Sequence, residues 1–200
     1  MTWGTITEDG VSAAEQLVNV PLRRDRMQWI EEITVDSIRH FAWGIGDNNP
    51  LWLDREYASQ SVYGELVAPP CILYAVDGTV VAPKFPGVQW LYAGTSWTWF
   101  EPILLADKFN VEARLKKQEL KSGRRFSKWV LQTGEINYFN QRGRMTGKAI
   151  ARCARTPRGE ALKKEKQSTT FKSAAPHCYS KKEIEEIENQ VLQEPRRGSE

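Results

Sequence analysis

Cysteine, histidine and long apolar runs are scarce in this chain of 200 residues. The cysteines Cys71, Cys153 and Cys178 form no CxxC pair and leave one unmatched in any disulfide scheme, which is typical of a reducing compartment. Only His40 and His177 could supplement them, without ligand spacing, so we expect no metal site. The sequence shows no run of eighteen apolar residues and no basic N-terminal region followed by one, so we expect a cytoplasmic protein without membrane span or signal peptide.

Apolar residues make up 40% of the chain, which is enough for a buried core, and the length fits one domain with extensions. The net charge of +3 is unevenly distributed, with fourteen Lys or Arg against three Glu between positions 108 and 158. Two interpretations are open: solvated strand and loop faces, or attraction for a polyanion. Because no RNP, helix-turn-helix or zinc-finger pattern accompanies the basic region, a phosphate-bearing small molecule fits as well as nucleic acid.

The first half of the chain predicts an arm followed by two helices. Residues 1–33 show little periodicity beyond a mildly helical stretch at 13–18, so we expect an arm that packs on the core. A helix is predicted from Thr34, an N-cap residue type, because apolar residues then recur at helical spacing up to Ile45. The glycine and asparagine residues up to Pro50 favour turns and end it.

A second helix is expected after Ala68-Pro69-Pro70, since proline is tolerated in a first helical turn. The following CILYAVDGTVVA, residues 71–82, is apolar nearly all round. Such a helix is buried on most sides, as if wrapped by a sheet.

The pattern changes to strands beyond Gly87. Residues 90–100 are rich in aromatics and threonine, and residues 109–116 alternate between apolar and polar. Further strands are predicted at 126–138 and 145–155, separated by glycine-containing turns. The sequence therefore predicts an α+β domain over residues 34–156, in which an antiparallel meander of long strands follows a buried helix.

Residues 157–200 are expected to form a polar linker and a C-terminal amphipathic helix. Ser180 and Glu183 make a capping box at its start. Its apolar stripe consists of Ile184, Ile187, Val191 and Leu192. The stripe is compatible with docking on its own domain and with binding another subunit.

The order of these features resembles the MaoC-like dehydratases, the (R)-specific enoyl-CoA hydratase family. The resemblance lies in a helix, then GDNNPLWLD at 46–54 and ASQSVYGELVAPPCIL at 58–73, and then long antiparallel strands. It covers roughly residues 30–155 and implies a hot-dog fold, in which a curled antiparallel sheet wraps a central helix.

In that family the motif runs Asp-x-Asn-Pro-apolar-His, and a glycine after Ala-Pro opens the buried helix. Hydration of an enoyl thioester needs a base for water and an acid for the alpha carbon, roles the family gives to the Asp and His. A backbone N–H at the start of the buried helix receives the developing enolate charge.

Matched residue by residue, this chain keeps the aspartate as Asp47, with Asn49 and Pro50 forming the turn. Trp52 stands in place of the histidine, and an indole N–H is a donor without acid-base chemistry near neutral pH. Pro70 stands in place of the glycine and has no N–H for an oxyanion. We therefore expect no intact catalytic set, with Trp52 filling the vacated site and Asp47 as a turn residue.

Relatives with two modules resemble a double hot dog, with one catalytic half and one degenerate half that makes room for a bulky acyl group. The leading hypothesis is that this chain is the non-catalytic subunit of a heteromeric enoyl-CoA hydratase whose partner carries the Asp-His motif. The alternatives are a self-sufficient hydratase or thioesterase using Asp47, for which His40 would be the available imidazole, and a regulatory module that binds acyl-CoA.

Coenzyme A would be part of the substrate, and no further cofactor is expected. Lys and Arg on the basic strands could bind its phosphates through charge-assisted hydrogen bonds. The tryptophans are compatible with positions in the core, at an interface, or in a pocket for an aromatic, branched or polycyclic acyl group. The candidate substrate-binding residues are Asn49, Trp97, Trp99, Arg124, Arg125, Arg142 and Arg144.

Overall fold

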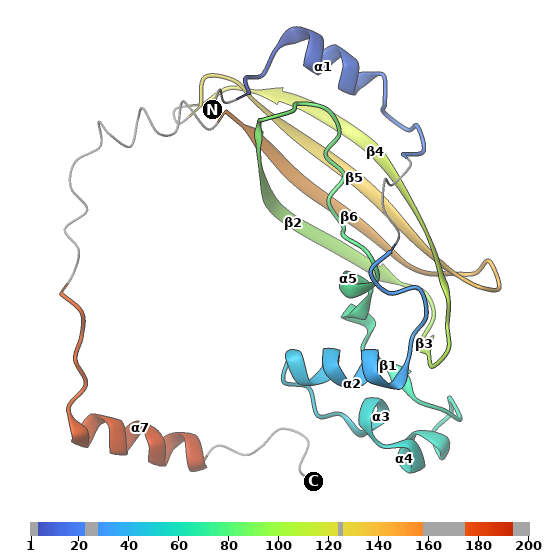
Figure 1. The fold of residues 1–200 in the computed structure, drawn as a ribbon, viewed down its shortest axis with the longest axis vertical. Helices are drawn as coiled ribbons and strands as arrows, with labels where there is room; N and C mark the ends of the chain where they lie inside the picture. The colour runs from blue at the N-terminus through green and yellow to red at the C-terminus, as the bar shows by residue number, and fades with distance from the viewer. Residues whose placement is uncertain (1–3, 23–27, 124–125, 158–174, 194–200) are drawn as a thin grey trace.

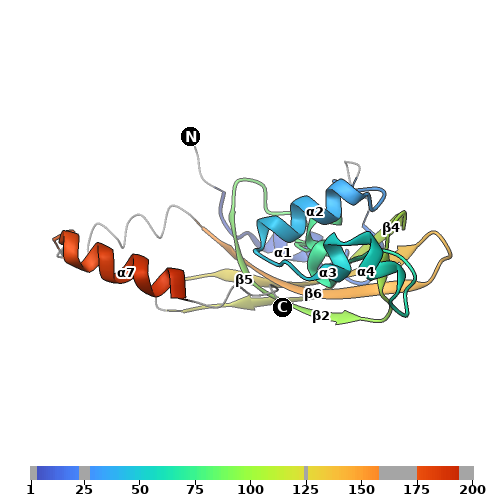
Figure 2. The same ribbon diagram turned by 90° about the horizontal axis from the view of Figure 1, so that it is seen from below.

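The computed structural model describes residues 4–22, 28–123, 126–157 and 175–193. Four long strands form one sheet, and short helices cover one of its faces (Figure 1, Figure 2). In chain order the elements are α1 (Glu8–Glu15), α2 (Val35–Gly44), α3 (Pro50–Leu53), α4 (Arg55–Ser59), β1 (Val67–Ala68), the 3-10 turn η1 (Pro70–Ile72), α5 (Leu73–Val76), β2 (Gln89–Trp99), β3 (Ile103–Leu104), β4 (Phe109–Lys121), β5 (Trp129–Asn140), β6 (Met145–Thr156) and α7 (Lys181–Gln193).

The sheet is antiparallel, with strand order β2-β6-β5-β4. The expected meander is correct for β4, β5 and β6, but β2 pairs with β6 and lies at the far edge. The β4 edge is approached by the N-terminal arm through isolated bridges from Val18 and Pro21. Among the described residues, β2 has no strand on its other side.

Alternation within the strands places the core on the helical side of the sheet. In β4, Phe109, Ala113 and Leu115 are buried and the polar residues between them are not, which confirms the alternation predicted for residues 109–116. In β5 every second residue from Val130 to Asn140 is buried as well. The largest core cluster includes Ile38 of α2, Leu73 of α5 and Ile136 of β5. The core therefore lies between the sheet and the helical segments.

The helix predicted from Thr34 is confirmed. The Thr34 side chain accepts from the N–H of Ser37, and the Ser37 hydroxyl accepts from the N–H of Thr34, so two otherwise unpaired donors are satisfied. The weak helix expected at 13–18 is wrong in position. It begins earlier, at Glu8, because the Thr7 hydroxyl accepts from Gly10 N–H and caps it there.

The central helix is much shorter than predicted. Helical structure ends at Val76, and Asp77 is fully extended, with φ −156° and ψ 156°. The Asp77 carboxylate accepts from Gly78 N–H, an alternative to continuing the helix. Residues 79–81 are Thr-Val-Val, whose branched side chains favour extended backbone. The chain therefore crosses the sheet without helical structure from residue 77 to residue 88.

Arg155 of β6 anchors this extended segment. The guanidinium is buried and donates hydrogen bonds to the backbone carbonyl groups of Ala82, Lys84, Phe85 and Val88. Lys84 and Phe85 both have positive φ, 64° and 55°, which is unfavourable for residues with side chains. The four charge-assisted hydrogen bonds offset that strain and hold the segment on the sheet.

The capping box predicted for the C-terminal helix is confirmed. The Glu183 carboxylate accepts from Ser180 N–H, and the Ser180 hydroxyl accepts from Glu183 N–H. Ile184, Ile187, Val191 and Leu192 are all exposed, so the stripe does not dock on the domain (Figure 1). Most of the expected linker, residues 158–174, lies outside the described residues.

Close approach of the central segment to the sheet predicts the effect of Gly134→Ala. A Cβ at Gly134 would lie 2.4 Å from Val81 Cβ and 2.7 Å from its Cγ2. We expect the free energy of unfolding to fall by about 1–3 kcal/mol in urea denaturation. Gly44→Ala is the matched control, because no atom of the described residues lies within 4 Å of that added carbon. Equal stability of the two variants would contradict the packing described.

Candidate functional site

The GDNNP turn is organised by the Asp47 carboxylate. Asp47 Oδ1 accepts from Asn49 N–H at 3.1 Å, and Asn49 Oδ1 accepts from Leu51 N–H at 3.0 Å, which caps α3. Gly46 supplies the positive φ of 70° that reverses the chain after α2. Two consecutive side-chain caps therefore position the residues that follow.

The other oxygen of the Asp47 carboxylate is hydrogen-bonded to Trp52. Its indole Nε1 donates to Asp47 Oδ2 at 3.0 Å, and the ring is partly buried against the core. Both Asp47 oxygens thus accept hydrogen bonds from within the turn. An indole neither gives up nor takes a proton near neutral pH, so this pair cannot pass a proton between its members.

The start of the buried helical segment lies near this pair. Burial raises the pKa of the Cys71 thiol. A hydrogen bond from the backbone N–H of Cys71 lowers this pKa by less, and the Asp47 carboxylate raises it further. Pro70 has no N–H, and its carbonyl accepts from Trp99 Nε1 at 3.0 Å. The structure thus brings Asp47 near the start of η1, where Trp99 reaches in from β2.

Trp97 and Trp99, both predicted for substrate binding, lie side by side on β2. Their rings are stacked, with centroids 5.8 Å apart and planes within 9°. Trp97 also packs on Tyr138 of the core and on Tyr74 of α5. Trp99 is 45% exposed, so the pair extends from the core to the surface.

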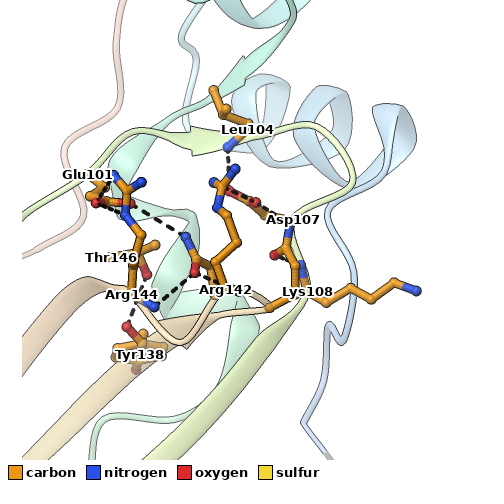
Figure 3. Close-up of polar contacts among 10 residues, drawn as sticks. Glu101, Leu104, Asp107, Lys108, Tyr138, Arg142, Arg144 and Thr146 are labelled. Carbon is orange, nitrogen blue, oxygen red and sulfur yellow. Dashed lines mark hydrogen bonds and ion pairs between the residues drawn. The ribbon is translucent and has the colours of Figure 1, made fainter.

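The predicted arginines lie at a different place, the β5–β6 turn (Figure 3). Arg144 pairs with Glu101, and Arg142 lies 3.7 Å from the buried Asp107 carboxylate. Asn140 Oδ1 accepts from the N–H groups of both arginines and closes the turn. Arg124 and Arg125 lie outside the described residues.

Most other basic side chains of the region also face acidic partners. The pairs are Lys108–Glu32, Arg114–Glu112, Lys117–Glu119, Lys121–Glu119, Lys128–Glu8 and Lys148–Glu135. Glu101 and Asp107 lie 43 and 35 residues before the arginines that they pair with, so no local sequence pattern marks them as partners of this turn. The positive field is accordingly weaker than the count of cations suggested.

Residues 24–147 match the family model for the FAS1-like dehydratase domain region. The chain belongs to this dehydratase family. Among solved structures it is similar to a MaoC-like dehydratase from Rhodospirillum rubrum, at 24% identity and a TM-score of 0.50, over 67% of this chain and 92% of that one. The predicted resemblance and the hot-dog fold are confirmed.

A second solved structure of this fold is the ChsH1-ChsH2 complex from Mycobacterium tuberculosis, at 15% identity and a TM-score of 0.59, over 76% of this chain and 99% of that one. A UPF0336 protein from Streptomyces avermitilis is 26% identical over 92 residues, which are 42% of this chain. This dehydratase-family chain spans 61% of that relative's length. No helix in the described part has the length and apolar character that a membrane span requires.

The contact between Asp47 and Trp52 predicts measurable coupling in a double-mutant cycle. Asp47→Ala removes the acceptor, and Trp52→Phe removes the indole N–H while keeping a smaller aromatic ring. The packing change that Trp52→Phe causes is present with either residue at position 47, so the cycle subtracts it. We expect a coupling free energy of about 1 kcal/mol in urea unfolding, because the hydrogen bond is charge-assisted but partly exposed. The control pairs Glu112→Ala with Trp52→Phe and should be additive. Additivity in the Asp47 cycle would show that the indole does not hold the carboxylate.

Proposed function

We propose that this chain is the non-catalytic subunit of a heteromeric MaoC-like enoyl-CoA hydratase. The assembly would hydrate a 2-enoyl-CoA, or dehydrate the 3-hydroxyacyl-CoA, on a partner hot-dog chain with an intact Asp-His motif. The observation that carries the proposal is the hydrogen bond from Trp52 to Asp47. In the family motif that this turn resembles, these two positions hold the acid-base pair.

Two groups of a hydratase, the histidine of the acid-base pair and the backbone N–H of the oxyanion site, lack a counterpart at this site. Trp52 supplies no proton-transfer group, and Pro70 supplies no N–H for the thioester oxygen. The available imidazole, His40, is exposed on α2, its ring centroid 6.2 Å from that of Trp43. A site without a proton relay and an oxyanion donor favours a role in assembly and substrate accommodation over chemistry.

The β2 edge supports a partner chain. This strand of eleven residues, QWLYAGTSWTW, contains no charged residue and no proline, the usual protections of a free edge. By contrast, β4 at the other edge carries alternating charged residues and is approached by the arm. Leu91 of β2, which stands opposite Ala154 and not opposite a buried position of β6, is exposed. The two-protein complex among the similar solved structures is consistent with such a pairing.

Contacts of coenzyme A with this chain remain a prediction. Arg142 and Arg144 would have to exchange Asp107 and Glu101 for phosphates, so the geometry favours a structural role at the turn. Asn49 already caps α3. Since coenzyme A is part of the substrate, the proposal requires no other cofactor.

The test is a hydratase assay on the complex purified with its native partner, whose mass is measured first. Asp47→Asn in this chain should leave kcat/KM within about twofold, whereas changing the partner's Asp or His should lower it by at least about a hundredfold. Asp36→Asn, an exposed carboxylate paired with Arg39, is the control.

Two outcomes would support the other functions instead. A homo-oligomer whose hydratase or thioesterase activity disappears in Asp47→Asn would establish a self-sufficient enzyme. A homo-oligomer that binds acyl-CoA without turnover would establish a regulatory module. Either result would overturn the subunit proposal.

A further inference from the structure

A row of aromatic side chains lies on the helical side of the sheet at the β2 edge. Pairing with β6 defines this side, because Trp90, Tyr92, Trp97 and Trp99 stand opposite Arg155, Cys153, Ala149 and Gly147, whose positions are buried. Tyr74 of α5 joins them through its edge contact with Trp97. We call these five residues the aromatic row: Tyr74, Trp90, Tyr92, Trp97 and Trp99.

The shortened central helix leaves this row open. Leu73 and Val81 sit directly on β6 and β5, where Gly147 and Gly134 have no side chain to hold them off. The central segment therefore packs over the middle strands and leaves much of β2 exposed, although Trp97 contacts the core. Trp90 is 57% exposed and Tyr92 51%, far more than aromatic residues on the inner face of a sheet usually are.

Polar groups at fixed positions accompany the rings. The Tyr74 and Tyr92 hydroxyls are 3.3 Å apart, Tyr92 donates to Thr95 Oγ1 at 2.7 Å, and Thr95 lies 3.3 Å from Thr79 Oγ1. This line of hydroxyls runs from α5 to β2. Hydroxyl groups can donate or accept, so the line can rearrange to bind an oxygen of either kind.

The Trp97 indole N–H is a further donor at this place. It is buried, and no described residue accepts from it at hydrogen-bonding geometry. Burial raises the pKa of the Tyr74 hydroxyl, but Tyr92, the nearby Trp97 indole and Thr95 outweigh it, so the pKa lies below its usual value. A buried donor without an acceptor is costly, which favours a ligand atom or water there.

We propose that the aromatic row binds the acyl part of the substrate and selects a flat, ring-bearing acyl group that carries a hydrogen-bonding oxygen. Flat rings stack on indole and phenol faces, whereas a flexible straight chain gains less from them and loses more conformational freedom. The inference rests on the proposed function, because Trp99 connects the row to Pro70 at the degenerate site. Occupation by the partner chain is the competing account.

The test measures binding to the native complex and does not depend on turnover. The probes are two saturated acyl-CoA esters with the same number of carbons, one straight and one ending in a fused bicyclic ring with a hydroxyl group. Calorimetry should give at least tenfold tighter binding of the ring ester. Trp90→Leu and Trp99→Leu should each remove most of that preference, while binding of the straight ester changes less than twofold.

Trp43→Leu is the control, since Trp43 is 56% exposed on α2, outside the row. Tyr92→Phe isolates the hydroxyl and should weaken binding only of a ring ester that bears oxygen. Equal binding of both esters, or equal losses for both in the Trp90 and Trp99 variants, would overturn the inference. Dissociation of the complex in Trp90→Leu without a change in ester preference would assign the row to the partner chain.

Hydration by the same complex is assayed separately with both unsaturated esters. Ring preference without hydration would uphold the binding inference and refute the proposed function. Hydration of the straight ester without a preference for the ring ester would support the proposed function and refute the binding inference.

Discussion

The close contact between the central segment and the middle of the sheet is the constraint from which the other features follow. Gly134 and Gly147 let Val81 and Leu73 sit on the strands themselves, and Arg155 holds the carbonyl groups of the same segment. With these contacts made by the short helix α5 and the extended chain that follows it, a long central helix is unnecessary. The inner face at β2 is left free, and its aromatic residues are available to a ligand or partner.

The second determinant is the local closure of the GDNNP turn. Asp47 uses one oxygen to cap its own turn and the other to accept from Trp52, so the motif is preserved as structure. The same geometry that could aim a carboxylate at a substrate here aims it at an indole. Membership in a dehydratase family is compatible with an Asp47 carboxylate that accepts from an indole if, as we propose, the chemistry takes place on a second chain.

Much of the fold could be predicted because its signals are local or periodic. The strand alternation, the Thr34 cap and the Ser180 capping box are visible in short windows of sequence. The prediction of a helix over residues 71–82 is wrong beyond Val76, because a short apolar run does not distinguish a buried helix from extended chain. At the site, the motif singles out Asp47 and Trp52, which the structure joins by a hydrogen bond, but the partners of Arg142, Arg144 and Arg155 come from distant segments that no local pattern reveals.

In the proposed assembly this chain performs no proton transfer at Asp47. The most direct measurement is a count of active sites by single-turnover hydration in a complex whose partner has its own catalytic Asp replaced by Asn. If Asp47 transfers no proton, we expect no turnover above the uncatalysed rate, while acyl-CoA still binds to the complex. Residual turnover that disappears when Asp47→Asn is added to this chain would contradict it.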